Sequence, residues 1–167
     1  MREIPEHLEK KLNIIFVGFN PSIISSETGH HYANPTNRFW KVLFEAGLTT
    51  RKFSPEEDRK LLELGYGLTN IVERPTKGAN DITKEEFIEG RKKLREKIEY
   101  YRPKVVCFVG KGVYQQYSGI KRCNWGKQDQ SMVDGVIDFV APSTSGLVRL
   151  PINEIVTIYK QLKSLVK

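Results

Sequence analysis

The chain has 167 residues, of which 39% are hydrophobic and 28% charged, a balance that is ordinary for a folded protein and argues against disordered and fibrous classes. This length suits one globular domain and is short for two, so we expect a single domain over residues 1–167. Lysine and arginine number 27 against 20 acidic residues, a formal net charge of +7. The excess favours an anionic partner, with nucleic acid as the first candidate, although a lysine-rich soluble surface would give the same count.

The first predicted element is a buried strand over residues 12–17, an apolar run rich in β-branched side chains that stops at Gly18. After a loop, residues 38–46 place apolar side chains at helical spacing, and Gly47 follows as a C-cap. Residues 54–65 begin with a Ser-Pro-Glu-Glu capping signal and predict a second helix.

The middle of the chain predicts a long helix followed by a second buried strand. Thr83 and Glu86 form a capping-box signal, and the helix must end at or before Arg102 because Pro103 disfavours helical geometry in the residue before it. The strand is predicted over residues 104–109, and a Gly-Lys-Gly turn leads from it into another helical stretch.

The last third predicts a turn and a final helix. The pair Asp134-Gly135 indicates a tight hairpin or turn between extended segments at 131–133 and 136–140. Pro151 opens an amphipathic helix. Strands that alternate with helices predict an α/β fold, a three-layer α/β/α sandwich with a mostly parallel central sheet and functional loops at the carboxyl ends of the strands.

The two cysteines, Cys107 and Cys123, form neither a CxxC pair nor a ligand set with the three histidines. A disulfide scaffold, a structural zinc and an iron–sulfur cluster are therefore not expected, and we predict no metal and no cofactor. The N-terminus lacks the apolar region of a signal peptide, and no stretch is apolar for long enough to cross a bilayer. We expect an intracellular, cytoplasmic protein without a membrane partner, associated with the nucleoid if the source is a prokaryote.

Chemically versatile side chains gather directly after the first predicted strand. Residues 18–22 read Gly-Phe-Asn-Pro-Ser, residues 29–32 Gly-His-His-Tyr and residues 37–40 Asn-Arg-Phe-Trp. Asn-Pro alone is most often a turn, but ligands of open α/β sheets bind at this edge. Asn20 is not a strong base near neutral pH, although its amide carbonyl can hold a water in line with a reacting carbon. Such a site suits a reaction whose leaving group departs easily.

These motifs closely resemble the first motif of the mismatch-specific uracil/thymine-DNA glycosylases, within the uracil-DNA glycosylase superfamily. Residues 67–76, Gly-Leu-Thr-Asn-Ile-Val-Glu-Arg-Pro-Thr, are similar to the second base-pocket segment of that family. Residues 142–147, Pro-Ser-Thr-Ser-Gly-Leu, are similar to its DNA-intercalating loop. The resemblance runs from about residue 12 to the C-terminus.

The resemblance implies that Asn20 is the catalytic residue, orienting the hydrolytic water, and that Tyr32 stacks on the extruded base. The base-binding set is expected to be Gly18, Phe19, Ser22, His31, Tyr32 and Asn70. The asparagine at position 70 matches the thymine-acting branch, whereas other bacterial members often carry a lysine there. His30 and His31 either polarise the base or pack beside it.

The second half of the expected site contacts the duplex. Leu147 could fill the gap that a flipped base leaves in the stack, although a lone leucine after Ser-Gly is more often a core residue. Lys111 and Arg149 are candidate phosphate contacts, because one lies at a predicted helix N-terminus and the other follows the loop. The DNA-binding residues are predicted to be Lys111, Ser143, Ser145, Gly146, Leu147 and Arg149.

The sequence thus predicts a monofunctional glycosylase that removes uracil, and as further candidates thymine or ethenocytosine, from duplex DNA opposite guanine. Its partner is expected to be double-stranded DNA with a mismatched or damaged pyrimidine, and the protein a monomer. One alternative is a general uracil-DNA glycosylase that also acts on single strands. Another is a non-catalytic nucleic-acid-binding module on the same fold, because Asn20 stands where faster branches of the superfamily use an aspartate.

Overall fold

A five-stranded sheet forms the centre of the computed structural model, which describes residues 4–167. The strands lie in the order β2-β1-β3-β5-β4. They are β1 (Ile14–Gly18), β2 (Tyr66–Asn70), β3 (Val105–Val109), β4 (Gly126–Lys127) and β5 (Ile137–Ala141). Only the short β4 runs antiparallel to its neighbour β5, and the other pairs are parallel. The predicted α/β fold with a mostly parallel sheet is confirmed.

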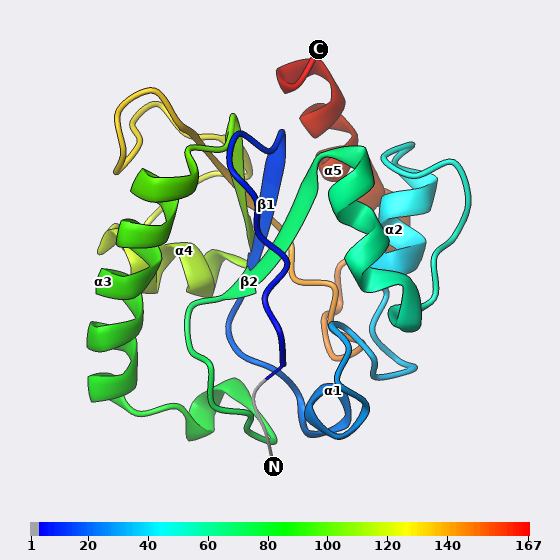
Figure 1. The fold of residues 1–167 in the computed structure, drawn as a ribbon, viewed down its shortest axis with the longest axis horizontal. Helices are drawn as coiled ribbons and strands as arrows, with labels where there is room; N and C mark the ends of the chain where they lie inside the picture. Colours follow the sequence, from blue (N-terminus) through cyan, green and yellow to red (C-terminus); the bar gives the residue numbers. More distant parts are fainter. Residues whose placement is uncertain (1–3) are drawn as a thin grey trace.

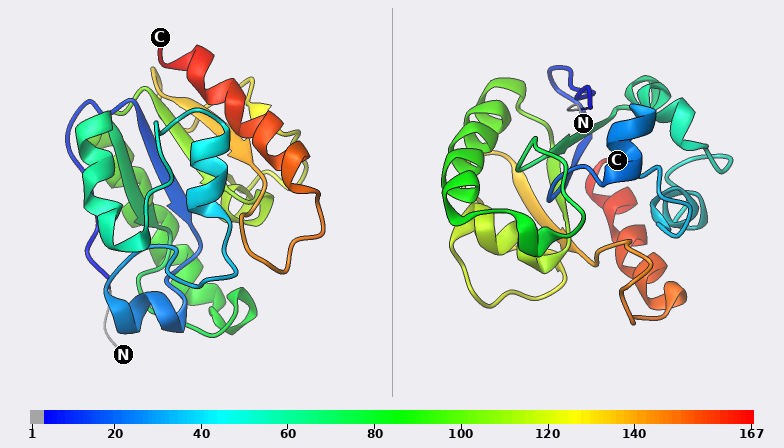
Figure 2. Two further views of the ribbon diagram at one scale, coloured as in Figure 1. Left: turned by 90° about the vertical axis from the view of Figure 1, so that its right-hand side faces the viewer. Right: turned by 90° about the horizontal axis from the view of Figure 1, so that it is seen from below.

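Helices cover both faces of the sheet (Figures 1 and 2). Helices α3 (Lys84–Tyr101) and α4 (Lys111–Ser118) lie on one face, and α2 (Phe39–Glu45), α5 (Ile152–Leu165) and the 3₁₀ helix η1 (Pro55–Leu64) lie on the other. Two short helices, α1 (Ile23–Thr28) and η2 (Ala79–Asp81), belong to the loops beyond the sheet. The arrangement is the predicted three-layer sandwich. None of the helices in the described range is both long and apolar enough to span a membrane.

The strands are apolar on both sides because each side packs against a helical layer. In β1, Ile14 and Phe16 belong to the core shared with α2 and α5, whereas Ile15 and Val17 belong to the core shared with α3 and α4. The strand is completely buried. The loop that follows Gly18 therefore starts from a rigid base.

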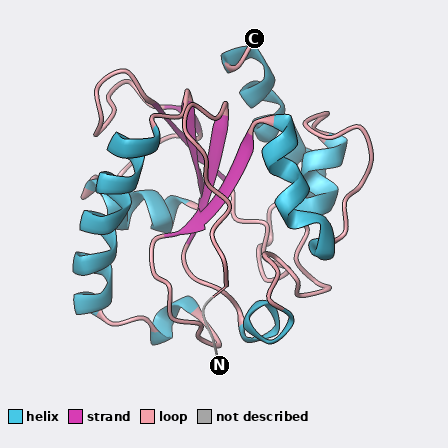
Figure 3. Cartoon of the chain, viewed as in Figure 1, coloured by secondary structure: helices cyan, strands magenta, loops and turns pink. Residues whose placement is uncertain are grey.

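The carboxyl ends of the four parallel strands meet at one edge of the sheet, the lower edge in Figure 1. Loops and α1 gather there, as Figure 3 shows. This is the edge at which open α/β sheets bind their ligands.

Several predicted elements are confirmed, with bounds that differ by one or two residues. Helix α3 begins after Thr83, whose side-chain oxygen accepts from the backbone N–H of Glu86, and it ends before Arg102. Residues 54–65 form a helix that begins with the predicted capping box, but it is a 3₁₀ helix throughout.

The prediction of an extended segment at 131–133 is wrong. The turn at Asp134-Gly135 forms, with Gly135 at φ 85°, but the antiparallel partner of β5 is β4. The segment 131–133 does not pair with the sheet. The backbone N–H of Met132 donates instead to the side-chain oxygen Oδ2 of Asp138 at 3.2 Å.

Candidate active site

A cavity of about 480 Å³ opens at the carboxyl edge of the sheet. Its walls come from the ends of β1 and β2, the loop around Tyr32, residues 76–79 and the loop after β5. Most of the predicted site residues line it: Gly18, Phe19, Asn20, Ser22, His31, Tyr32, Asn70, Ser143, Ser145, Gly146 and Leu147. Segments far apart in sequence are thus brought together as the motif pattern predicted.

The side-chain amide of Asn20 is held in one orientation. Its Nδ2 donates to the backbone carbonyl of Arg74 at 2.7 Å and to Oγ1 of Thr76 at 2.8 Å. A carbonyl can only accept, so the nitrogen must face these partners. The Thr76 hydroxyl donates its proton to the carbonyl of Gly78, so its oxygen accepts the hydrogen bond from Asn20. Within the described chain Oδ1 has no hydrogen-bond partner, so it is left to accept from a ligand or a water.

The segment that holds Asn20 is itself tied to α3. The guanidinium of Arg74 makes two parallel hydrogen bonds of 2.8 Å to the carboxylate of Glu86, the capping-box residue of that helix. The Arg74 guanidinium lowers the pKa of Glu86 to about 2. This ionic clamp fixes the position of the Arg74 carbonyl that accepts from Asn20.

Gly18 lies so close to its neighbours that a side chain at this position would overlap them. A Cβ atom at this position would lie 2.6 Å from Oδ1 of Asn70 and 3.1 Å from the hydroxyl of Tyr32. Gly18 at the end of β1 pairs with Asn70 at the end of β2, so the backbone of Gly18 lies beside the side-chain amide of Asn70. The side-chain oxygen of Asn70 and the hydroxyl of Tyr32 therefore both lie beside Gly18 in the cavity wall.

Tyr32 combines a covered ring face with an unpaired hydroxyl. Its ring stacks on Phe39, with centroids 3.9 Å apart and planes 12° apart, and the residue lines the cavity. The backbone at Tyr32 has φ 51°, and its carbonyl accepts from Nε1 of Trp40 at 3.2 Å. The hydroxyl is buried without a hydrogen-bond partner in the described chain, and burial raises the pKa of the phenol.

Two residues of the first motif have structural contacts besides their place at the cavity. Ser22 is the N-cap of α1, and its Oγ accepts from the backbone N–H of Ser25 at 3.1 Å. The ring of Phe19 turns to the opposite layer, edge-on to Phe87, and packs closely against Gly112. The ring of Phe19 is therefore engaged with the layer of α3 and α4.

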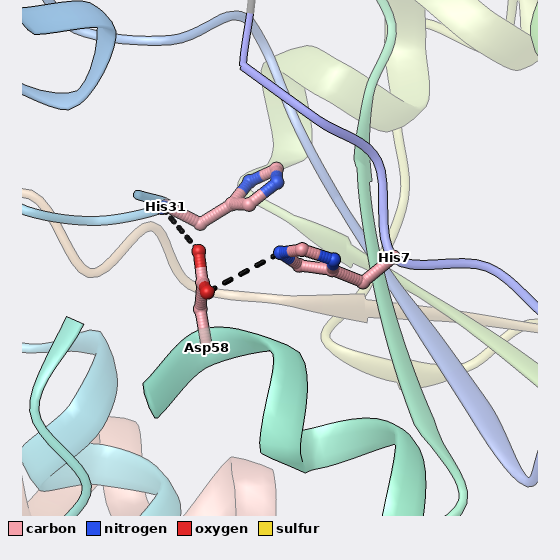
Figure 4. A group of neighbouring side chains, drawn as sticks. All are labelled: His7, His31 and Asp58. Carbon is pink, nitrogen blue, oxygen red and sulfur yellow. Dashed lines mark hydrogen bonds and ion pairs between the residues drawn. The ribbon is translucent and has the colours of Figure 1, made fainter. Parts of the chain in front are cut away.

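The two histidines of the motif approach the carboxylate of Asp58 in η1. Oδ2 of Asp58 accepts from the backbone N–H of His31 at 2.9 Å, and Oδ1 lies 3.3 Å from Nδ1 of His30. His7, from the N-terminal segment, completes the group (Figure 4). His31 is 1% exposed, and its Nε2 donates to the carbonyl of Pro5 at 2.7 Å. The His31 ring thus anchors the loop that carries Tyr32.

The loop after β5 is fastened to the segment before α2. The guanidinium of Arg38 donates to the carbonyls of Ser145 and Val148, both at 3.2 Å. The buried Thr144 hydroxyl donates to Oδ1 of Asn37 at 2.7 Å. Leu147 nevertheless projects into solvent, with 92% of its surface exposed. The core-packing alternative for Leu147 is therefore wrong.

The two predicted phosphate contacts lie outside the cavity wall. Lys111 begins α4, and its ammonium lies 4.3 Å from the ring centroid of Trp125. Arg149 is exposed two residues beyond Leu147. Neither residue lines the cavity. From outside it, both could contact the backbone of a long polymeric ligand.

Sequence reasoning assigned no role to four residues that position the site. Arg74 and Thr76 lie inside the second motif, so their contact with Asn20 could have been suspected from it. His7 and Asp58 belong to no motif, and only the fold brings them to His31.

Comparisons with known proteins identify the superfamily and the fold. A sequence model described as "Uracil DNA glycosylase superfamily" matches residues 5–163. A solution NMR structure from Methanosarcina acetivorans, described as a "putative Uracil DNA glycosylase", superposes with a TM-score of 0.62 at 23% identity, over 97% of this chain and 98% of that chain. At this identity the structural likeness concerns the fold.

Proposed function

Because the chain belongs to the uracil DNA glycosylase superfamily, we propose that it is a monofunctional DNA-repair glycosylase that excises uracil from duplex DNA opposite guanine and leaves an abasic site. Thymine and ethenocytosine opposite guanine are further candidate substrates. The partner is duplex DNA, and the protein acts as a monomer.

The observation that carries the proposal is the fixed amide of Asn20. Two acceptors hold its nitrogen, so its carbonyl oxygen can accept a hydrogen bond from a water at the mouth of the cavity. The amide is too weak a base to remove a proton before the bond breaks. Its contribution is to place the water in line with the sugar carbon as the base departs, which lowers the entropic part of the barrier.

The departing base takes the electron pair of the glycosidic bond and becomes an anion, while the sugar becomes cationic. Hydrogen-bond donors placed where the negative charge develops stabilise that state. The Tyr32 hydroxyl is an unpaired donor in the described chain, and the Asn70 amide lies beside it across Gly18. These groups suit the oxygen-bearing edge of a pyrimidine.

Access to the base requires it to leave the duplex. Flipping costs a few kcal/mol, and the cost falls for a mismatched base, which favours G-mismatched substrates. The ring of Tyr32 offers a stacking face to the flipped base, and the exposed Leu147 can enter the gap it leaves. Arg38 holds the Leu147 loop in place, so the wedge starts from a fixed position.

The test is an excision assay on labelled duplexes that carry uracil, thymine or ethenocytosine opposite guanine, with uracil opposite adenine and uracil in a single strand for comparison. We expect strand breakage at uracil opposite guanine only after alkali, as an abasic product requires. Breakage without alkali would indicate a lyase step and contradict the monofunctional assignment.

The same assay separates the alternatives. Equal excision from single strands and from both pairings would favour a general uracil-DNA glycosylase. Specific binding to the mismatched duplex with no release of any base would favour a binding module and overturn the proposal.

A further inference from the structure

Three buried side chains from distant parts of the chain converge beside the Tyr32 loop (Figure 4). They are His7 from the N-terminal segment, His31 from the loop after α1 and Asp58 from η1. One potential ligand atom of each lies within 4.8 Å of the other two. The residues are 5%, 1% and 2% exposed, so the group is closed to bulk solvent.

The ring of His7 lacks the hydrogen bonds that a buried imidazole needs. Its Nε2 lies 3.3 Å from Oδ1 of Asp58, but neither ring nitrogen makes an aligned hydrogen bond to a described residue. Leaving a buried polar atom unpaired is destabilising, and a bound ion or water is one of the explanations for such an atom. The Nε2 atom of His7 faces the carboxylate of Asp58, where a cation would contact both.

The tautomer of His31 is set by its other neighbour. The carbonyl of Pro5 accepts from Nε2 at 2.7 Å, so the proton is on Nε2 and the lone pair is on Nδ1. A ligating histidine commonly donates its second nitrogen to a backbone carbonyl in this way.

Asp58 supplies the negative charge of the group. Its Oδ2 accepts from the backbone N–H of His31 at 2.9 Å, and its Oδ1 accepts from the backbone N–H of Arg59 at 2.8 Å. Hydrogen bonds of this kind favour the charged carboxylate. Two imidazoles and one carboxylate together form a donor set that zinc and related divalent transition metals bind.

We propose that His7, His31 and Asp58 form a structural binding site for a divalent transition metal, with Zn²⁺ as the best match to two nitrogens and one oxygen. The metal ties the N-terminal segment and η1 to the loop that carries Tyr32. His30, with Nδ1 3.3 Å from Oδ1 of Asp58, is the nearest further imidazole. The three proposed ligands do not include Asn20, and the proposal stands whether or not the protein excises bases.

The experiment measures metal binding directly on the full chain. Chelator-treated protein is titrated with Zn²⁺ by calorimetry and with Co²⁺ by visible absorption, and its Tm is recorded with and without Zn²⁺. We expect one Zn²⁺ per chain and d–d bands of low-symmetry Co²⁺. At a hundredfold excess of Zn²⁺ over Kd, Tm should rise by about 5–10 °C.

Two variants separate the site from adventitious binding. His7→Gln removes one ligand at the end of the chain and should lose both the stoichiometric binding and the Tm rise. His30→Gln leaves the three proposed ligands intact and should keep one equivalent and most of the Tm rise. Absence of saturable binding by the wild type, or equal binding by His7→Gln, would overturn the proposal. The contact between His7 and Asp58 would then be explained by a shared proton instead of a metal ion.

Discussion

At the scale of single residues, the proposed chemistry depends on the direction of one amide. Asn20 is oriented by Arg74 and Thr76, and Arg74 is in turn paired with the half-buried carboxylate of Glu86. An amide has no useful basicity, so its contribution to hydrolysis must come from geometry. In the proposed mechanism, each of these hydrogen bonds acts through the position of the Asn20 carbonyl oxygen.

Ser22 is expected to set the range of bases that the cavity admits. In the strict uracil branch of the superfamily, which differs from the mismatch-specific branch that the sequence resembles, a tyrosine at the matching position is expected to crowd C5 of the base. Serine is small, and Ser22 lines the cavity here. Without such a clash, a pocket discriminates one methyl group by only about 1–3 kcal/mol. We predict that Ser22→Tyr lowers single-turnover excision of thymine and 5-substituted uracils more than excision of uracil.

Ser22→Ala is the control for that comparison, because Ser22 also caps α1 and both variants lose the cap. The alanine variant should lose activity to a similar degree on every base. If Ser22→Tyr likewise reduces all substrates equally, the steric explanation is wrong and only the cap matters.

At the scale of elements, the loop after β5 presents an exposed leucine on a braced backbone. The bonds from Arg38 to Ser145 and Val148 reduce the ordering that DNA binding would otherwise require. We predict that Leu147→Ala weakens binding to a G:U duplex by roughly tenfold, as expected for loss of a buried leucine contact. The salt dependence should not change because no charge is removed. A parallel fall in affinity for undamaged duplex would contradict the role of Leu147 as a wedge.

Strand β5 carries a buried carboxyl that should make stability depend on pH. Asp138 is 1% exposed, its Oδ1 has no partner in the described chain, and burial raises its pKa from 3.8 to about 6. Between these values the folded state holds a proton that the unfolded state has lost, so this group adds stability as pH falls from 7 to 4. A shift of this size corresponds to about 2–3 kcal/mol.

Asp138→Asn should remove this contribution. The free energy of unfolding, measured by urea titration from pH 7 to pH 4, should show a smaller gain, or a larger loss, toward acid in the variant than in the wild type. Identical pH profiles of the two proteins would show that Asp138 keeps an ordinary pKa.

The elements that were hard to predict are those that depend on distant partners. The run Tyr-Gly-Leu-Thr-Asn of β2 mixes two residues that favour strands, Tyr and Thr, with two that disfavour them, Gly and Asn. It becomes a strand because β1 offers a fully buried neighbour. Helix α1 has six residues and depends on the cap from Ser22. By contrast, α3 carries its own start signal at Thr83 and its stop before Pro103, so local sequence was enough. Asn20 and Tyr32 lie in continuous motifs, whereas His7 and Asp58 are neighbours only in the fold.

At the scale of the whole molecule, the chain carries a formal net charge of +7, and the carboxyl edge of its sheet bears the cavity and the Leu147 loop. Each phosphate that the protein neutralises contributes about −0.9 to the slope of log affinity against log salt. We predict a slope steeper than about −2 for undamaged duplex, measured by fluorescence anisotropy over a series of salt concentrations. A flat plot would remove the main physical support for a DNA partner.

The account stands most directly on Asn20. Single-turnover excision of uracil opposite guanine, compared between wild type and Asn20→Ala with duplex affinity measured in parallel, tests it. We predict a loss in rate of about a hundredfold or more with nearly unchanged affinity, because the amide positions water and makes few contacts with the duplex. A variant that excises uracil near the wild-type rate would contradict the assignment of Asn20 as the residue that orients the attacking water.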